Sequence, residues 1–211
     1  MRYERDEDLK GSEVRLWALI AERTRAGADK ARIDRRIWDL FGEDWAVMFT
    51  DLSGFSRQVA AFGIIHFLQI IYEQKRLLLP IAAAHDGILI KVEADSFLLI
   101  FKRAESALKC AIEMQHECAA HNKRLPPEER VLLCVGLGFG RILRLGDADV
   151  FGQEVNAASK LGEDIAKADE ILVTGAAQRA IGEAPGISYL PMDPTIQVPG
   201  SESNFRVEYP R

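Results

Sequence analysis

Residues 46–55 read AVMFTDLSGF, a short apolar run that ends at an acid, Asp51. A run of this length predicts a buried strand. A second acid, Asp95, lies within residues 88–101, ILIKVEADSFLLIF, between two apolar segments that predict neighbouring strands. A carboxylate at the end of a buried strand costs free energy unless something pairs with it. Alone, each acid is typical of a turn-capping aspartate. Together on adjacent strands, the two could hold one or two Mg²⁺ ions, which prefer carboxylates and substrate phosphates.

Outward from these segments, helices and strands follow one another in an α+β pattern with hairpins, unlike a doubly wound sheet. The expected helices are 57–84, interrupted near Gly63 and with a kink at Pro80, then 104–122, 153–168 and 176–181. The expected strands are 46–50, 88–91, 96–101, 131–137, 141–145 and 171–174, with a weak terminal hairpin near 196–198 and 205–207.

Residues 1–43 are rich in charge and predict amphipathic helices separated near Gly27. Two interpretations stand side by side. The segment is either an extension packed on the main domain, or a helix that dimerises or transmits a signal.

The composition narrows the class of protein. The 211 residues carry a formal net charge of −5, which disfavours a nucleic-acid-binding surface. No apolar run approaches about 18 residues, so no membrane span is expected, and the charged N-terminus is unlike a signal peptide. Three cysteines in predicted helix and strand are typical of reduced thiols in the cytosol. We therefore expect a cytoplasmic protein with one main domain.

Five segments, in order, resemble the motifs of the class III adenylate and guanylate cyclases. They are FTDLSGF (49–55), KVEAD (91–95), VGLGFGRI (135–142), DVFGQEVNAASKL (149–161) and EILVT (170–174). One such segment would be a weak signal, but five in the family's order are specific. The resemblance implies a ferredoxin-like βαββαβ core in a cyclase homology domain over 44–211, preceded by a helical extension over 1–43.

The resemblance also implies a reaction and a set of roles. The reaction is conversion of ATP to 3′,5′-cyclic AMP and pyrophosphate, with two Mg²⁺ or Mn²⁺ ions, at sites formed across a homodimer. In this family one chain supplies the metal-binding aspartates and the other supplies the residues that read the base. The implied metal ligands are Asp51, Asp95 and the Leu52 carbonyl; phosphate contacts come from Ser53, Gly54, Phe55 and Arg141; Lys91 and Asp149 read adenine; Asn156 orients the ribose; and Lys160 stabilises the transition state.

Several positions depart from the family pattern. Ala94 replaces the glycine before the second aspartate, and Glu93 replaces an apolar residue. Glu93 could add a third carboxylate near the metals or pair with Lys91. Lys160 replaces an arginine and so loses the planar, bidentate guanidinium. Pro199 stands where the family commonly has a lysine, for which Arg206 could substitute.

These departures leave alternatives open. The chain could be a weakened cyclase homologue that binds nucleotide and metal as a regulatory dimer. It could also be a cyclase for another nucleoside triphosphate. Paired carboxylates on a ferredoxin-like sheet also occur in polymerase palms and diguanylate cyclases, and fold alone does not decide function.

Overall fold

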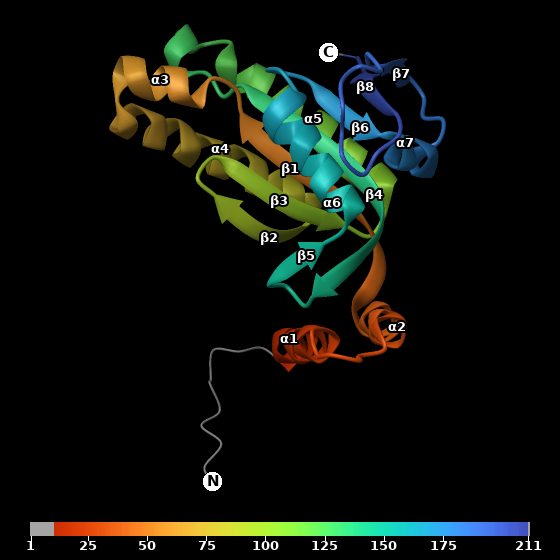
Figure 1. Cartoon of the computed structure of the whole chain (residues 1–211). Coiled ribbons are helices and arrows are strands. Elements are labelled where there is room, and N and C mark those ends of the chain that lie inside the picture. Colours follow the sequence, from red (N-terminus) through yellow and green to blue (C-terminus); the bar gives the residue numbers. More distant parts are fainter. Residues whose placement is uncertain (1–10, 211) are drawn as a thin grey trace.

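The computed structural model describes residues 11–210, except for the side chains of residues 55–58 (Figure 1). Its helices are α1 (Gly11–Arg23), α2 (Lys30–Phe41), α3 (Phe55–Phe62), α4 (Ile64–Ala84), α5 (Ala104–Asn122), α6 (Gln153–Ser159) and α7 (Gly175–Ile181), with a 3₁₀ turn η1 (Pro127–Glu129) and a π-helical turn η2 (Lys160–Ile165). Its strands are β1 (Gly42–Leu52), β2 (Ile88–Glu93), β3 (Ser96–Phe101), β4 (Leu133–Leu145), β5 (Asp149–Phe151), β6 (Ile171–Thr174), β7 (Ser188–Pro191) and β8 (Asn204–Glu208).

The strands form one sheet in the order β2-β3-β1-β4-β6-β8-β7, and β5 pairs with β4. Strand β1 is antiparallel to both β3 and β4, and β2 is antiparallel to β3. With α3 and α4 between β1 and β2, and α5 between β3 and β4, this is the antiparallel ferredoxin-like arrangement. The predicted βαββαβ core and the α+β class are therefore confirmed.

Helices cover the two faces of the sheet. Helices α4, α5 and α7 pack on one face over a large apolar core that includes Met48, Leu99 and Val135. Helix α6 packs on the other face, where its Val155 and Ala158 contact a smaller cluster around Val47. Because side chains alternate along a strand, Asp51 lies on the same face of β1 as Val47, which is the face that α6 covers.

Strand β4 corrects the sequence-based prediction of two separate strands. The glycines at 136, 138 and 140 do not break it; they let α6 approach the sheet. A Cβ atom at Gly136 would collide with the Ala158 carbonyl oxygen, and one at Gly138 would lie 2.6 Å from the Glu154 carbonyl oxygen. The glycines therefore set the distance between strand and helix.

Three further predictions are corrected near the C-terminal half. Strand β5 was not expected, because three residues give no periodic signal. The helix predicted over 153–168 ends as an α-helix at Ser159 and continues as the π-helical turn η2. The terminal hairpin pairs β8 with β7, not with residues 196–198, where the Ile196 amide closes a turn onto the Asp193 carbonyl.

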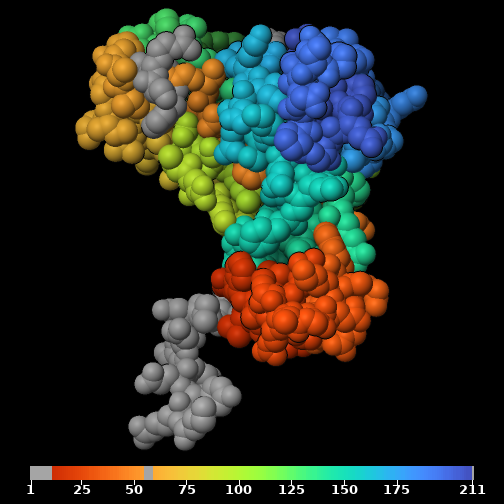
Figure 2. All heavy atoms as spheres, viewed as in Figure 1, coloured from red at the N-terminus to blue at the C-terminus, as the bar shows by residue number. Residues whose placement is uncertain are grey.

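The N-terminal helices α1 and α2 form a hairpin below the sheet, against the ribbon of β4 and β5 (Figures 1 and 2). Leu19 and Ile37 are buried together with Leu145 of β4, and Arg23 donates to Asp34 at 2.6 Å across the hairpin. The two helices predicted around Gly27 are thus confirmed. Within residues 11–210, no helix combines the length and the apolar character needed to cross a bilayer.

Candidate active site

The two acids singled out from the sequence meet at one end of β1. Asp95 is only 7% exposed, and Asp51 accepts a hydrogen bond of 3.0 Å from Ser96 Oγ. Burial, and then the charge of Asp95, raise the pKa of Asp51 to about 6. Burial likewise raises the pKa of Asp95. A divalent cation would stabilise both carboxylates, because burial disfavours the charge of each and the charge of Asp95 adds to the effect on Asp51.

The turn between β2 and β3 positions Asp95. Ala94 and Asp95 are the two turn residues, because Glu93 pairs with Ser96 across the hairpin. Ala94 has a φ of 51°, in the left-handed region that favours glycine. Gln74 of α4, fully buried, donates to the Asp95 carbonyl oxygen at 2.7 Å. The chain thus holds a strained turn in place with a buried hydrogen bond from a helix.

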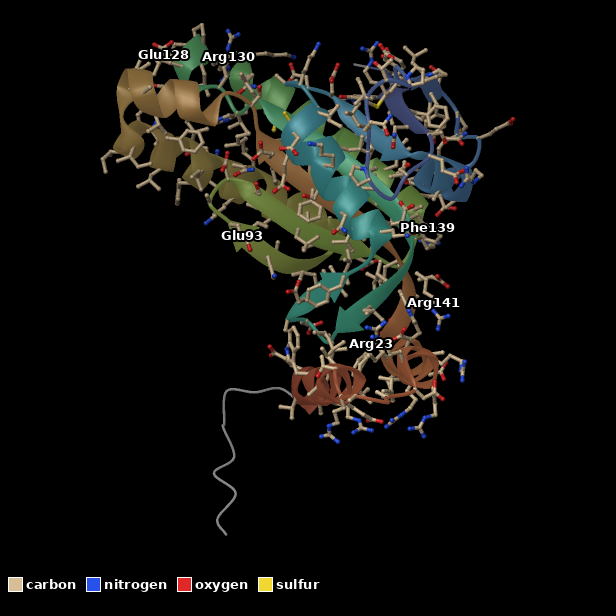
Figure 3. All side chains as sticks on the ribbon, in the orientation of Figure 1. Arg23, Glu93, Glu128, Arg130, Phe139 and Arg141 are labelled. Carbon is tan, nitrogen blue, oxygen red and sulfur yellow. The ribbon has the colours of Figure 1, made fainter. Side chains whose placement is uncertain are left out.

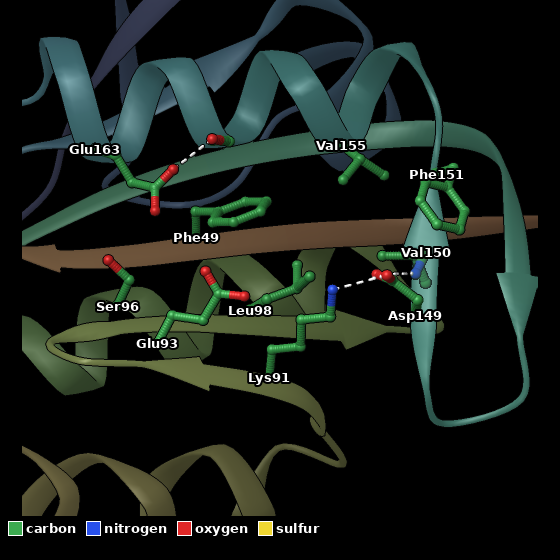
Figure 4. Close-up of a pocket in the computed structure, with 11 residues that line it drawn as sticks. Phe49, Lys91, Glu93, Ser96, Leu98, Asp149, Val150, Phe151, Val155 and Glu163 are labelled. Atoms are coloured by element: carbon green, nitrogen blue, oxygen red, sulfur yellow. Dashed lines mark hydrogen bonds and ion pairs between the residues drawn. The ribbon is translucent and has the colours of Figure 1, made fainter. Parts of the chain in front are cut away.

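A pocket of about 270 Å³ opens beside the acid pair on the α6 face of the sheet (Figure 4). Across it, Lys91 Nζ donates to Asp149 Oδ2 at 2.7 Å. The two residues expected to read the base are therefore brought together. The pairing of Lys91 with Glu93 that the sequence left open is not formed, because Lys91 pairs with Asp149 instead. The lining consists of Phe49, Lys91, Glu93, Ser96, Leu98, Asp149, Val150, Phe151, Val155, Ser159 and Glu163.

Sequence reasoning missed two polar contributors to this region. Ser96 directly follows Asp95 and is the first residue of β3. Its hydroxyl group donates a hydrogen bond to the Asp51 carboxylate. Glu163 lies in η2 and accepts a hydrogen bond from Ser159 Oγ. No sequence signal marks Glu163, because a π-helical turn is recognised only from the structure.

Three expected site residues do not reach this pocket within one chain. Arg141, on β4, lies over the Trp38 ring at 5.5 Å and donates to the Trp38 carbonyl oxygen at 3.0 Å. Figure 3 shows it beside α2 and well away from Glu93. Asn156 is exposed on α6. Lys160, at the α6–η2 junction, forms an ion pair of 2.8 Å with Asp164.

The segment expected to cradle phosphate is partly engaged. The Ser53 amide donates to the Leu132 carbonyl oxygen at 2.9 Å, so it is not free for a ligand. Leu52 is buried and Gly54 precedes the first turn of α3. The side chain of Phe55 lies outside the described residues.

The positions that replace or could replace the family's lysine lie elsewhere. Residues 198–200 pack against the start of α6, where a Cβ atom at Gly200 would lie 2.7 Å from the Gln153 carbonyl oxygen. Arg206 on β8 forms ion pairs with Glu208 at 2.9 Å and with Glu170 at 3.5 Å. Its guanidinium is therefore occupied within the chain.

Asp51 and Asp95 are the residues that could hold a metal. Over residues 11–210, no group of three or more His, Cys, Asp and Glu side chains is placed to do so. A third carboxylate from Glu93 is thus not assembled with the pair. Two carboxylates suit Mg²⁺, which keeps several water or phosphate ligands. The cysteines at 110, 118 and 134 are buried and unpaired, and burial raises their pKa values to about 12.

The chain matches known cyclases in sequence and in fold. Residues 42–204 match the adenylate and guanylate cyclase catalytic domain. An adenylate cyclase of Streptomyces coelicolor is 33% identical over 159 residues, 75% of this chain and 37% of that relative. The aligned segments make up 17%, 20% and 37% of the curated relatives, so the chain spans less than two fifths of their length.

Solved cyclase structures share the fold. The adenylate/guanylate cyclase/hydrolase from Silicibacter pomeroyi superposes with a TM-score of 0.69 at 23% identity, over 81% of this chain and 98% of that one. The adenylyl cyclase CyaB from P. aeruginosa gives a TM-score of 0.67 at 20% identity, over 81% and 96%. The match over residues 42–204, together with the paired acids and the Lys91–Asp149 pair, shows that the chain belongs to the adenylate and guanylate cyclase catalytic domain family.

Proposed function

We propose that the chain converts ATP to 3′,5′-cyclic AMP and pyrophosphate with two divalent cations, Mg²⁺ or Mn²⁺, in a homodimer. The observation that carries this proposal is the placement of two acids and a lysine–aspartate pair around one face of the sheet. The acid pair fits cations that bind triphosphate. The lysine–aspartate pair fits the edge of a purine base.

The acid pair supplies the metal site. Bound divalent cations lower the pKa of a ribose hydroxyl and neutralise developing charge on phosphate. Asp51 and Asp95 would hold them, and Ser96 keeps the Asp51 carboxylate in position. The hydrogen bond from Gln74 to the Asp95 backbone fixes the turn that presents the second carboxylate.

The lysine–aspartate pair supplies base recognition. Adenine offers an acceptor at N1 and a donor at its 6-amino group. Lys91 would donate to N1, and Asp149 would accept from the amino group. The 2.7 Å ion pair keeps the Lys91 and Asp149 side chains extended toward each other across the pocket. A base that enters between them would replace this one ion pair by two hydrogen bonds, one to each side chain.

A second copy of the chain would complete the site. Asn156 and Lys160 lie outside the pocket on the surface of α6 and η2, and Arg141 is at the far end of β4. Large apolar side chains near the pocket are also exposed, among them Phe151 at 41%. An exposed apolar rim around polar site residues is typical of an interface. In the proposed dimer, the acids of one copy face the base-reading residues of the other.

A second candidate is a regulatory dimer that binds nucleotide and metal without turnover. Its support is that Lys160 is engaged with Asp164, while Pro199 carries no charge. Loss of one transition-state donor costs about 10²–10³ in rate. A chain with both cations weakened would bind substrate but turn over slowly.

Incubation of the purified chain with Mn²⁺ and ATP, followed by mass spectrometry for cyclic AMP, tests the proposal. We expect cyclic AMP from the wild type and none from Asp51→Ala. Triphosphate binding by calorimetry without any product would favour the regulatory dimer. Absence of both binding and product would reject both candidates.

A further inference from the structure

A second groove, of about 510 Å³, lies between α5 and the residues that lead into β4. We call it the α5 groove, and the residues that give it its chemistry are Ala119, Lys123, Arg130, Leu132, Asp169 and Tyr209. It shares no lining residue with the candidate active-site pocket of about 270 Å³. Figure 3 shows Arg130 well away from Glu93, which lines that pocket. A groove of this volume can bury a small organic molecule.

Hydrogen bonds between α5 and the entry to β4 fix the walls of the groove. Asn122 donates to the Val131 carbonyl oxygen at 2.8 Å and accepts from the Val131 amide at 2.9 Å. Farther back along the helix, the buried Gln115 donates to the Leu133 carbonyl oxygen at 3.1 Å. Seven residues of helix span about 10 Å, so the two walls are held together over that length. A pre-formed groove spares a ligand the cost of ordering its own site.

Two cations stand at the Asn122 end of the groove. Lys123 makes no hydrogen bond or ion pair with the rest of the described chain. Arg130 donates from Nε to the Leu125 carbonyl oxygen at 3.2 Å, and its terminal nitrogens have no partner among the described residues. A carboxylate accepts from such nitrogens in strong, charge-assisted bonds. This end of the groove therefore fits an anionic group.

The middle of the groove is apolar and leads to an aromatic ring. Ala119, which has only a methyl group, and Leu132 line the middle. Beyond them lies Tyr209, whose ring centroid is 5.8 Å from that of His116. His116 Nε2 also donates to the Pro210 carbonyl oxygen at 2.8 Å, which holds this part of the chain against α5. The middle of the groove therefore fits an apolar ring.

An acid stands at the far end. The Asp169 amide donates to the Leu133 carbonyl oxygen at 2.9 Å, so Asp169 lies beside Leu133. The chain leaves Arg130 in an extended conformation, and three extended residues span about 10 Å. The Asp169 carboxylate has no hydrogen bond or ion pair with any other residue that the structure describes. This end therefore fits a hydrogen-bond donor.

We propose that the α5 groove binds a small aromatic carboxylate that carries a hydrogen-bond donor at its far end. The carboxylate binds Lys123 and Arg130, the ring lies in the apolar middle, and the donor binds Asp169. The reverse orientation is excluded because it would place the ligand's negative charge beside that of Asp169. This second site goes beyond the proposed cyclase function and does not depend on it.

Calorimetry with 3-(4-hydroxyphenyl)propanoate in EDTA tests the proposal, because this probe has a carboxylate, a ring and a phenol donor. We expect a Kd of about 1 mM or tighter for the wild type. Lys123→Gln and Arg130→Gln should each raise the Kd by about 5-fold or more. Arg124→Gln removes the same charge from an exposed neighbour that does not line the groove, and it should leave the Kd within about 2-fold.

Two further measurements locate the probe. 3-Phenylpropanoate lacks the phenol donor and should bind about 5-fold more weakly than the hydroxylated probe. Asp51→Ala alters the candidate active site and should bind the probe as the wild type does. A wild-type Kd above about 10 mM, equal losses in Lys123→Gln and Arg124→Gln, equal affinities for the two acids, or loss of binding in Asp51→Ala would each overturn the inference. None of these results bears on cyclic AMP formation, which is measured separately.

Discussion

Replacement of Asp51 by asparagine is expected to stabilise the metal-free protein at neutral pH while it removes the response to divalent cations. The reason is that the acid pair is arranged for a cation and is unfavourable without one. Asparagine keeps an oxygen that accepts the hydrogen bond from Ser96. It removes the charge that burial and Asp95 disfavour.

The size of the effect follows from the pKa. Burial and the charge of Asp95 raise the pKa of Asp51 from 3.8 to about 6. One pKa unit corresponds to about 1.4 kcal/mol, so a fully shielded carboxylate would cost about 3 kcal/mol at pH 7.5. Asp51 is partly exposed, and water screens part of this cost. We therefore expect Asp51→Asn to raise the free energy of unfolding by about 1–2 kcal/mol.

The stability gained by Asp51→Asn should depend on pH. The folded state holds the Asp51 proton more tightly than the unfolded state does, so this group lowers stability as pH rises from about 4 to above 6. The gain from Asp51→Asn should be complete above about pH 7 and should vanish near pH 4. Urea unfolding in EDTA at both pH values measures it. Asp44→Asn, an exposed acid on the same strand, serves as the control and should change the free energy by less than about 0.5 kcal/mol.

Divalent cations should reverse the order of stability. Added Mn²⁺ should raise the Tm of the wild type at pH 7.5, with less effect below about pH 6, where Asp51 takes up a proton. The Tm of Asp51→Asn should hardly respond. An Asp51→Asn protein that is no more stable than the wild type in EDTA at pH 7.5, or that gains equally at pH 4, would show that the Asp51 charge does not destabilise the metal-free fold.

Three other substitutions test the β2–β3 turn, the contact between β4 and α6, and the role of Lys160. Ala94→Gly should raise the free energy of unfolding in urea by about 0.5–1 kcal/mol, because glycine adopts a φ of 51° without a strained Cβ atom. A lower free energy of unfolding would contradict this. Gly136→Ala should lower the free energy of unfolding by about 2–3 kcal/mol, because the added Cβ atom would strike the Ala158 carbonyl and the Gly162 amide. An unchanged urea midpoint would show that α6 can shift. Lys160→Arg should raise the rate of cyclic product formation by about 10-fold, because a guanidinium binds phosphate in bidentate fashion. An unchanged rate would show that residue 160 does not contact the transition state.

The central part of the fold could be predicted from the sequence because its signals are local. Apolar runs predicted β1, β2 and β3, with Asp95 between the second and third of them. The resemblance assigns Lys91 and Asp149 to the base, and the structure brings the two side chains together in an ion pair. Their role in reading adenine stays a prediction. The homodimer, the nucleotide and the metals stay predictions.

The continuous strand β4, the position of Arg141, strand β5 and the turn η2 could not be predicted, because they depend on tertiary packing that has no local sequence signal. The glycines of β4 signal a break when read locally, yet they serve the close approach of α6. That continuous strand carries Arg141 away from the pocket to α2, where Trp38 holds it. Strand β5 is too short for a periodic signal, and η2 brings Glu163 into the pocket through a turn that propensities do not describe.

The most direct test of the account mixes two variants, Asp51→Ala and Lys91→Ala. The proposed dimer joins the acids of one copy to the base-reading residues of the other. With random exchange, about half of the dimers are mixed, and each mixed dimer has one intact site of two, so the mixture should recover about a quarter of wild-type cyclic product formation. Each variant alone should be nearly inactive, and native mass spectrometry confirms exchange. A wild type without product, or an exchanged mixture no more active than its components, would contradict the account.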